Sequence, residues 1–271
     1  MHGTGLWSRE LRYHKDHAEL AEAAAELEEL GYTALWYPGF TGGDVFGAAR
    51  RLLDATTAIT VAPGILNVWG HEPAEVNTEF PTLPERFLLG IGVGHPQATA
   101  EYQKPLQKIN GFLDELDVPK DRMILAALGP KMLDTARERS SGAHPYFVPV
   151  AHTAYARERL GTGPVLAPEC AVVLEADPEA ARALARGHME VYLGLTNYTN
   201  NLLRHGFDES DLADGGSDRL VDAIVAWGDD DVIAKRLQEH RDAGADHVCW
   251  QVIHAGDGLP LEEWRRLAAI G

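Results

Sequence analysis

The sequence feature that most constrains the fold is an alternation of short apolar segments with amphipathic helical segments. Residues 17–30 place alanine and leucine side chains on one helical face, and Gly31 is suited to end that helix. The next segment, TALWY at 33–37, has the composition of a buried strand and is followed by Pro38-Gly39, which would end it. The order of helix, glycine and apolar strand recurs in DAGADHVCW at 242–250. This order is typical of βα units around a parallel sheet.

The same alternation continues along the whole chain. Further strands are predicted at 60–62, 86–94, 122–128, 145–150, 168–176 and 245–253, and further helices at 44–56, 73–79, 130–141, 152–160, from 178, 231–243 and 260–270. About eight strands, each followed by a helix, favour a (β/α)₈ TIM barrel that comprises residues 1–271 as a single domain. A doubly wound open sheet is the alternative. Residues 194–217 show the least pattern and are expected to form a long loop at one rim.

Composition narrows the class of protein. The formal net charge is −17, which disfavours binding to nucleic acid or anionic lipid. No apolar run reaches the ~20 residues that a membrane-spanning helix needs, and the start of the chain lacks the pattern of a secretory signal. The two cysteines, Cys170 and Cys249, lie far apart and indicate neither a disulfide framework nor a metal site. We therefore expect a protein of the reducing cytoplasm.

In a parallel barrel the functional site lies at the C-terminal ends of the strands, so the residues there are the candidates. The third predicted strand is interrupted at Pro63-Gly64. The chain that follows it carries a side-chain amide (Asn67), an indole (Trp69) and an imidazole (His71). The histidines that follow a strand end are better candidates for chemistry than the others. The candidates from these strand ends are Trp7, Trp36, Gly64, Ile65, Asn67, Trp69, His71, Gly94 and His95.

Two glycine-containing motifs suggest what the site could hold. GIGVGHP at 90–96 does not complete the G-x-G-x-x-G dinucleotide pattern, but its glycines would let the backbone approach a flat group. In ALGPKM, Gly129 and Pro130 would begin a helix whose free N–H groups face the strand ends, with Lys131 nearby. An ordinary helix start is the alternative for the second motif. Together the motifs favour a flat anionic cofactor over a hydrolytic triad.

The motifs APGILNVW-x-x-x-P, RFLLGIGVGH and LAALGPKMLDTARERSSGAH, taken together, resemble the bacterial luciferase-like superfamily (the LLM class) of flavin and deazaflavin oxidoreductases. Within that superfamily the chain looks most like the actinobacterial branch that uses coenzyme F420. The resemblance implies a TIM barrel with the deazaflavin across its mouth and a small-molecule substrate beside it. It also implies a possible homodimer.

The resemblance implies roles for individual residues. A non-proline cis peptide that backs the cofactor ring falls at Gly64–Ile65, and Asn67 would hydrogen-bond a ring edge. The phosphate site maps onto Ala127, Leu128, Gly129 and Pro130, and Gly94, Gly142 and Ala143 would complete the cofactor wall. The cations for the anionic tail could come from Lys104, Lys131 or Arg137.

The expected activity is hydride transfer between C5 of the deazaflavin and a small organic substrate. His95 is the candidate proton donor or acceptor, with His71 in reserve, and Trp7, Trp36 and Trp69 would wall the substrate. The acid–histidine pair of the sugar-phosphate dehydrogenases is replaced by Pro38-Gly39, so that activity is not expected. The alternatives are a monooxygenase that uses flavin mononucleotide (FMN), a non-catalytic deazaflavin- or flavin-binding protein, and a phosphate-handling isomerase or lyase. The last would need a strand-end lysine or paired carboxylates, which the sequence does not provide.

Overall fold

A computed structural model describes residues 1–39, 43–98 and 103–271. The strands are β1 (Gly3–Trp7), β2 (Ala34–Tyr37), β3 (Thr60–Pro63), β4 (Leu66–Asn67), β5 (Leu89–Gly92), β6 (Met123–Leu125), β7 (Gly142–Ala143), β8 (Val165–Leu166), β9 (Glu169–Val173), β10 (Val225–Trp227) and β11 (His247–Val252). The α-helices are α1 (Glu10–Tyr13), α2 (His17–Glu29), α3 (Val45–Ala55), α4 (Pro73–Glu79), α5 (Pro105–Asp114), α6 (Pro130–Arg139), α7 (Val150–Leu160), α8 (Pro178–Leu193), α9 (Thr196–Arg204), α10 (Glu209–Leu212), α11 (Asp218–Ile224), α12 (Asp230–Asp242) and α13 (Leu261–Ile270).

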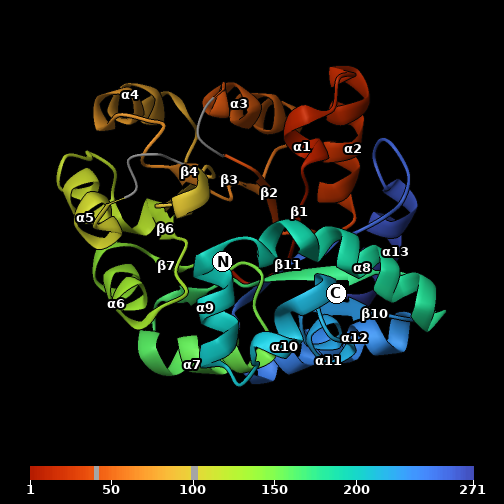
Figure 1. The fold of residues 1–271 in the computed structure, drawn as a ribbon. Coiled ribbons are helices and arrows are strands. Elements are labelled where there is room, and N and C mark those ends of the chain that lie inside the picture. The colour runs from red at the N-terminus through yellow and green to blue at the C-terminus, as the bar shows by residue number, and fades with distance from the viewer. Residues whose placement is uncertain (40–42, 99–102) are drawn as a thin grey trace.

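The strands form a closed parallel barrel. Their hydrogen-bonded order is β10-β9-β11-β1-β2-β3 in one sheet and β4-β5-β6-β7-β8 in the other. The chain segments 60–67 and 165–173 each supply a strand to both sheets, so the two sheets join at both edges. β10 pairs only with β9 and stands outside this ring in the part of the chain that the structure describes. The predicted TIM barrel is confirmed, and Figure 1 shows the helices arranged around the strands.

The helices pack on the barrel through faces that the sequence determines. Helix α2 begins at Asp16, whose side chain accepts hydrogen bonds from Ala18 N (3.0 Å) and Glu19 N (3.1 Å). It buries Leu20 and Leu27 in the main hydrophobic core. Burial of one such leucine side chain stabilises the fold by about 1.5–3 kcal/mol. Each helix therefore holds its strand in place by one apolar face.

Several predicted elements are wrong in type or place. Residues 145–150 were predicted as a strand, but the sixth strand is β7 at Gly142–Ala143 and the segment after it is a loop. Pro145 and Pro149 lack the N–H groups that a strand in the ring would donate, and Phe147 takes a φ of 56°. Residues 194–217, expected to be a long loop, contain α9 and α10. Helix α5 and strands β8 and β10 were not predicted.

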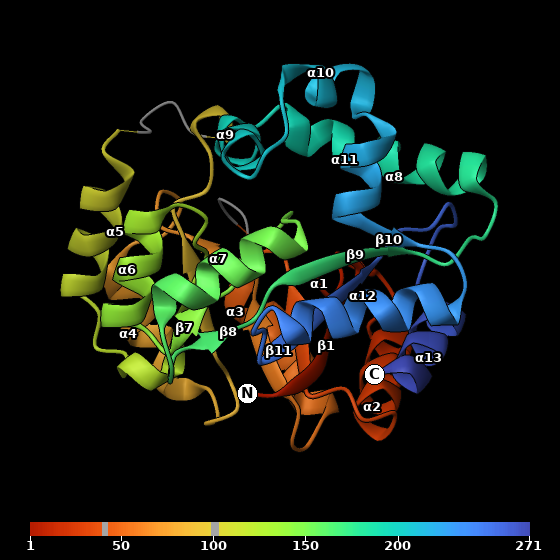
Figure 2. The ribbon, with the colours of Figure 1, turned by 90° about the horizontal axis from the view of Figure 1, so that it is seen from below.

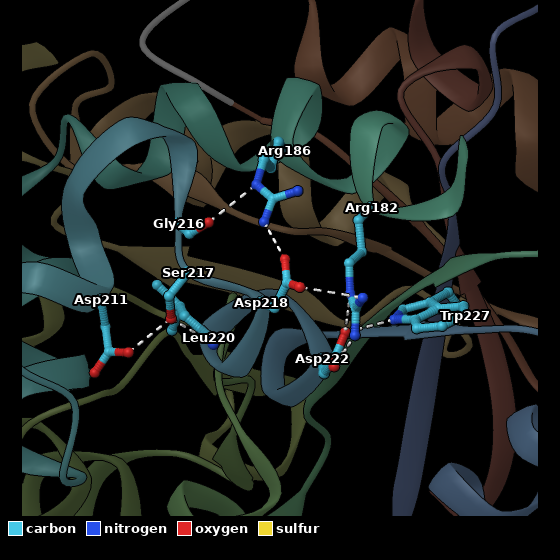
Figure 3. Close-up of polar contacts among 9 residues, drawn as sticks. All are labelled: Arg182, Arg186, Asp211, Gly216, Ser217, Asp218, Leu220, Asp222 and Trp227. Carbon is cyan, nitrogen blue, oxygen red and sulfur yellow. Dashed lines mark hydrogen bonds and ion pairs between the residues drawn. The ribbon is translucent and has the colours of Figure 1, made fainter. Parts of the chain in front are cut away.

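Helices α8 to α11 lie together on one side of the barrel (Figure 2). An arginine network joins α8 to α11: Arg182 binds Asp222 through Nε (2.9 Å to Oδ1) and Asp218 through a second nitrogen (3.2 Å). Arg186 donates to Gly216 O (3.0 Å) and to Asp218 (2.5 Å), as Figure 3 shows. The indole of Trp227 donates to Asp222 as well (2.7 Å). We call these residues the α8–α11 network.

Among the described residues, no helix combines the length and the apolar character that crossing a membrane requires.

Candidate functional site

A cavity of about 530 Å³ lies at the C-terminal ends of the strands, with the α8–α9 segment across it. It is lined by Trp7, Gly64, Ile65, Asn67, Val93, Gly94, His95, Pro105, Ala126, Ala127, Leu128, Gly129, Met132, His144, Tyr146, Val191, Tyr192, Leu195, Asn197, Tyr198, Asn200 and Arg204. Most of these side chains are apolar or aromatic. A cavity of this kind in this position is the expected place for a ligand in a parallel barrel.

The peptide bond between Gly64 and Ile65 is cis, as the resemblance implies for this position. Close packing explains the glycines around it. A Cβ atom on Gly64 would lie 2.5 Å from Nε1 of Trp7, and one on Gly92 would lie 2.8 Å from Cγ1 of Ile65. Only glycine fits at either point, so Ile65 reaches into the cavity above a strand that has no side chain there.

The loop after β5 is fixed by amide groups on both sides. Asn67 is buried and accepts a hydrogen bond from Trp69 N (3.0 Å). Gly94 has a φ of 58°, and a Cβ atom there would lie 2.3 Å from Nδ2 of Asn67. From α9, Nδ2 of Asn197 donates to the carbonyl oxygen of Gly94 (3.0 Å). The α8–α9 segment is therefore tied to the strand ends that it covers.

Helix α6 directs its N-terminus at the cavity. Gly129 is the N-cap, Pro130 is the first helical residue, and no side chain caps the helix. Apart from its own chain neighbours, no atom of the described residues lies within 4 Å of the position of a Cβ on Gly129, so the helix start is open. Arg204, from α9, lines the same cavity. An open helix N-terminus with a guanidinium in the same cavity suits an anionic group.

Of the predicted catalytic histidines, only His95 reaches the cavity. Its Nδ1 has no hydrogen-bond partner within the described residues, and its ring centroid lies 4.5 Å from that of Tyr198. Burial lowers the pKa of His95 to about 4, so the ring is neutral at pH 7. His71 does not line the cavity: its Nδ1 contacts Glu75 (3.1 Å) at the start of α4.

Two of the three predicted substrate-wall tryptophans lie elsewhere. Trp36 is fully buried inside the barrel, where it stacks on His144 at 4.2 Å and donates to Nε2 of His247 (3.3 Å). Trp69 donates to the carbonyl oxygen of Val93 (2.9 Å) and is not among the residues that line the cavity. Only Trp7 lines the cavity.

Some of the predicted cofactor-binding residues line the cavity and others do not. Ala127, Leu128 and Gly129 line the cavity, whereas Pro130 follows inside the helix. Gly142 and Ala143 do not line it, because they form β7 between β6 and β8. A Cβ on Gly142 would lie 1.9 Å from Val165 O, so this glycine serves strand packing.

The predicted cations lie outside the cavity lining. Lys104 and Lys131 are exposed at the starts of α5 and α6. Arg137 donates to the carbonyl oxygen of Arg159 (3.1 Å) and contacts Glu138 (3.1 Å) on the outer surface.

Sequence reasoning missed the residues that the sixth strand end and the α8–α9 segment contribute, namely His144, Tyr146, Tyr192, Tyr198 and Arg204. His144 and Tyr146 follow β7. They were not recognised as strand-end residues because the sixth strand was predicted at 145–150 instead of 142–143. The phenol oxygen of Tyr146 bonds to Tyr192 (2.7 Å) and donates to Gln251 (2.6 Å), which joins α8 to the barrel. Within the described ranges, no group of three His, Cys, Asp or Glu residues could hold a metal ion.

A second hollow, of about 380 Å³, lies between β10 and α12. It is smaller than the cavity at the strand ends, and charged side chains such as Lys235, Arg236 and Glu239 line it. We therefore place the candidate site in the larger cavity.

The chain matches no family model and no curated protein. It does match solved structures over nearly its whole length. An F420-dependent secondary alcohol dehydrogenase in complex with an F420–acetone adduct has a TM-score of 0.73 at 12% identity, covering 99% of this chain and 98% of that chain. The coenzyme F420-dependent tetrahydromethanopterin reductase from Methanopyrus kandleri has a TM-score of 0.68 at 15% identity, covering 98% and 96%.

An FMN-bound structure also matches over nearly the whole chain. The oxygenating constituent of 3,6-diketocamphane monooxygenase from Pseudomonas putida, in complex with FMN, has a TM-score of 0.68 at 13% identity, covering 99% of this chain and 97% of that chain. The shared fold is that of the luciferase-like TIM barrels, and these matches include deazaflavin-dependent and flavin-bound proteins alike. At these identities the likeness establishes the fold.

Proposed function

We propose that this chain is a coenzyme F420-dependent oxidoreductase that transfers a hydride between C5 of the deazaflavin and a small organic substrate. The observation that carries the proposal is one cavity that contains both the cis peptide at Gly64–Ile65 and the open N-terminus of α6. The luciferase-like fold, shared with two F420-dependent proteins, adds support.

The residues present fit such a cofactor. Its flat ring would lie against Gly64 and Ile65, with Asn67 at the ring edge. Its phosphate would meet the backbone of Ala127 to Gly129, where the helix dipole of α6 favours negative charge. When bound, the deazaflavin supplies a carbon that accepts or releases a hydride.

The protein's own part is to position the substrate and to exclude water. Trp7, Tyr146 and Tyr198 give the cavity apolar walls, and Asn197 holds α9 over the mouth by its bond to Gly94. His95 would contact the substrate as a neutral imidazole, because burial keeps its pKa near 4. His71 is buried beside Glu75, outside the cavity lining, and takes no part in this proposal.

A flavin mononucleotide monooxygenase is the second candidate, because the FMN-bound relative has the same fold over nearly the whole chain. The purified protein titrated with coenzyme F420 and, in parallel, with FMN would separate the two, with cofactor fluorescence as the readout. Saturable binding of the deazaflavin alone supports the proposal. A preference for FMN moves the assignment to the monooxygenase, and binding of neither rejects both.

A bound reduced cofactor that no acceptor oxidises would indicate a non-catalytic binding protein. We further propose a cytoplasmic location, consistent with two buried free thiols, and a homodimer that light scattering would detect.

A further inference from the structure

Arg12 is a buried cation that is not among the residues lining the cavity. It lies on the short helix α1, is 7% exposed, and its Nη1 donates to the carbonyl oxygens of Pro38 (2.7 Å) and Gly39 (2.5 Å). A buried charge lowers stability unless hydrogen bonds replace its water, and hydrogen bonds from an ionised donor are stronger than neutral ones. The guanidinium therefore fixes the backbone that follows β2.

Gly39 packs directly on the peptide between Ile65 and Leu66. A Cβ atom on Gly39 would lie 2.2 Å from the carbonyl oxygen of Ile65, 2.5 Å from its carbonyl carbon and 2.7 Å from the backbone nitrogen of Leu66. All three are backbone atoms, which cannot turn away as the end of a long side chain can. Only glycine fits at this point, so the position of Gly39 limits where the backbone of Ile65 can lie.

Gly64 and Ile65 line the cavity, and we call this pair the Gly64–Ile65 wall. The N–H of Gly64 donates to the carbonyl oxygen of Tyr37 (2.7 Å), the last residue of β2. The Ile65 side chain packs over Gly92 of β5, where a Cβ would lie 2.8 Å from its Cγ1. The wall is therefore held by β5 on one strand and by the end of β2, which Arg12 fixes in turn.

We propose that Arg12 is a positioning residue for the ring of the bound cofactor. Its two hydrogen bonds hold Pro38 and Gly39 against the Ile65 peptide, so that the Gly64–Ile65 wall keeps one position behind the ring. The inference rests on the proposed function, which places the ring against that wall. Without the guanidinium, the carbonyl oxygens of two buried residues lose this donor, and the contact between Gly39 and Ile65 loses its support.

Arg86 provides a matched control at the opposite end of β3. Its guanidinium also donates to backbone carbonyl oxygens, those of Thr56 (2.7 Å) and Ile59 (3.2 Å), which precede the strand. Like Arg12, it is not among the residues lining the cavity. Arg12→Met and Arg86→Met each remove a donor to backbone carbonyls, so both should lower the melting temperature. Only the loss of Arg12 should displace the Gly64–Ile65 wall.

The first measurement needs no cofactor. In the purified protein, the backbone N–H signal of Ile65 in a ¹⁵N NMR spectrum reports the position of the wall. We expect Arg12→Met to shift this signal and Arg86→Met to leave it unchanged. Arg12→Lys, which keeps a charged donor, should shift it less than Arg12→Met does. An unchanged Ile65 signal in folded Arg12→Met would overturn the inference.

Gly39→Ala keeps the measurement decisive if Arg12→Met does not fold. It retains the guanidinium but places a methyl group against the Ile65 carbonyl, so the same signal must shift. Gly187→Ala on α8 is its control, because outside its own helix backbone no described atom lies within 4 Å of its Cβ position. An Ile65 signal that Gly39→Ala leaves in place would overturn the inference as well.

The second measurement is a fluorescence titration of each variant with coenzyme F420. We expect Arg12→Met to bind about tenfold more weakly than wild type, and Arg86→Met to stay within about twofold of it. The absorption maximum of the bound deazaflavin should move in Arg12→Met alone, because only there does the ring lie against a displaced wall. Equal affinities of the two folded variants would overturn the inference.

Failure of this inference can be told apart from failure of the proposed function. If the wild-type protein binds F420 and Arg12→Met binds it as tightly, the inference fails and the proposed function stands. If the wild-type protein binds neither F420 nor FMN, the proposed function fails and the role of Arg12 towards a cofactor fails with it.

Discussion

Polar side chains are paired with one another in the α8–α11 network, whereas two buried nitrogen atoms at the base of the cavity have no partner among the described residues. In the network the guanidinium groups of Arg182 and Arg186 meet Asp218, Asp222 and a backbone carbonyl. At the base of the cavity, Nε1 of Trp7 and Nε2 of His144 are left without partners among the described residues. Both regions use few residues and lie near the same helix, α8.

The α8–α11 network serves as a scaffold, whereas the cavity contains the polar groups available to a ligand. Exposed ion pairs add little stability singly, but a connected set orients two helices. An unpaired buried nitrogen lowers stability, and Trp7 and His144 each carry one among the residues that line the cavity. The comparison predicts that changes at the cavity alter ligand binding and pH dependence, whereas changes in the network alter stability alone.

The largest expected effect concerns Glu169, a fully buried acid whose Oε2 accepts from Phe147 N (3.0 Å) while Oε1 has no partner among the described residues. Burial raises its pKa from 4.5 to about 8. Between these values the folded protein keeps a proton that the unfolded chain has released, so stability falls as pH rises. Glu169→Gln should remove a pH-dependent loss of roughly 2–4 kcal/mol. Urea unfolding at pH 5 and pH 8 measures it.

The exposed Glu179 on α8 supplies the control for that experiment, as Glu179→Gln. Wild type and Glu169→Gln showing the same dependence of unfolding free energy on pH would mean that Glu169 is ionised in the folded protein.

Two histidines line the cavity, His95 and His144, and their variants should differ in turnover. With any substrate that the enzyme turns over, proton transfer through His144 would make His144→Phe lower turnover about 100-fold, the scale of a lost acid–base group. His95→Phe keeps a ring beside Tyr198 and should cost less than tenfold. Stopped-flow absorbance of the deazaflavin follows both reactions. A larger loss from His95→Phe would return the proton-transfer role to His95.

The third prediction concerns the loop that holds the cofactor edge. Gly94→Ala places a methyl group 2.3 Å from Nδ2 of Asn67 and forces an alanine to a φ of 58°. The amide must move, and F420 affinity should fall about 30-fold, or ~2 kcal/mol. Gly111→Ala on α5 is the control, because outside its own helix backbone no described atom lies within 4 Å of its Cβ position. Equal affinities in the two variants would show that Asn67 does not touch the cofactor.

The smallest effect is expected in the network. Asp222→Ala removes one of the two acidic partners of Arg182 and the acceptor of the Trp227 indole, and it should cost about 1 kcal/mol of unfolding free energy, because the ion pair is partly exposed to water. F420 affinity should stay unchanged. Thermal unfolding and a cofactor titration measure both, with Glu190→Ala, an exposed site on α8, as control. A loss of F420 affinity without a loss of stability would contradict the expectation that the network affects stability alone.

Much of the fold could be predicted because helix faces and strand composition repeat along the chain. The junction of α2, Gly31 and β2 is encoded locally, by the Asp16 cap and by a glycine with a φ of 93°. The strand at 145–150 was misplaced since apolar composition alone does not reveal that two prolines prevent pairing. Helix α9 was not predicted because it is short and its buried face is not purely apolar: it includes Tyr198 and Asn201 as well as Leu202.

The site could be predicted as far as strand ends determine it. Gly64, Asn67 and Gly129 follow from the parallel barrel, and the structure brings them to one cavity. His144 could not be found this way, because its importance depends on a partnerless nitrogen that only the packed barrel reveals. Trp36 was misassigned for the complementary reason: its strand position is right, but its side chain points into the core.

The most direct test of the central claim is a crystal structure of the protein with coenzyme F420. We expect the deazaflavin ring against Gly64 and Ile65, its phosphate at the start of α6, and the part of the cavity beside Trp7 and His144 left open for substrate. Deazaflavin density in the hollow between β10 and α12, or a ring that lies away from the cis peptide, would contradict it.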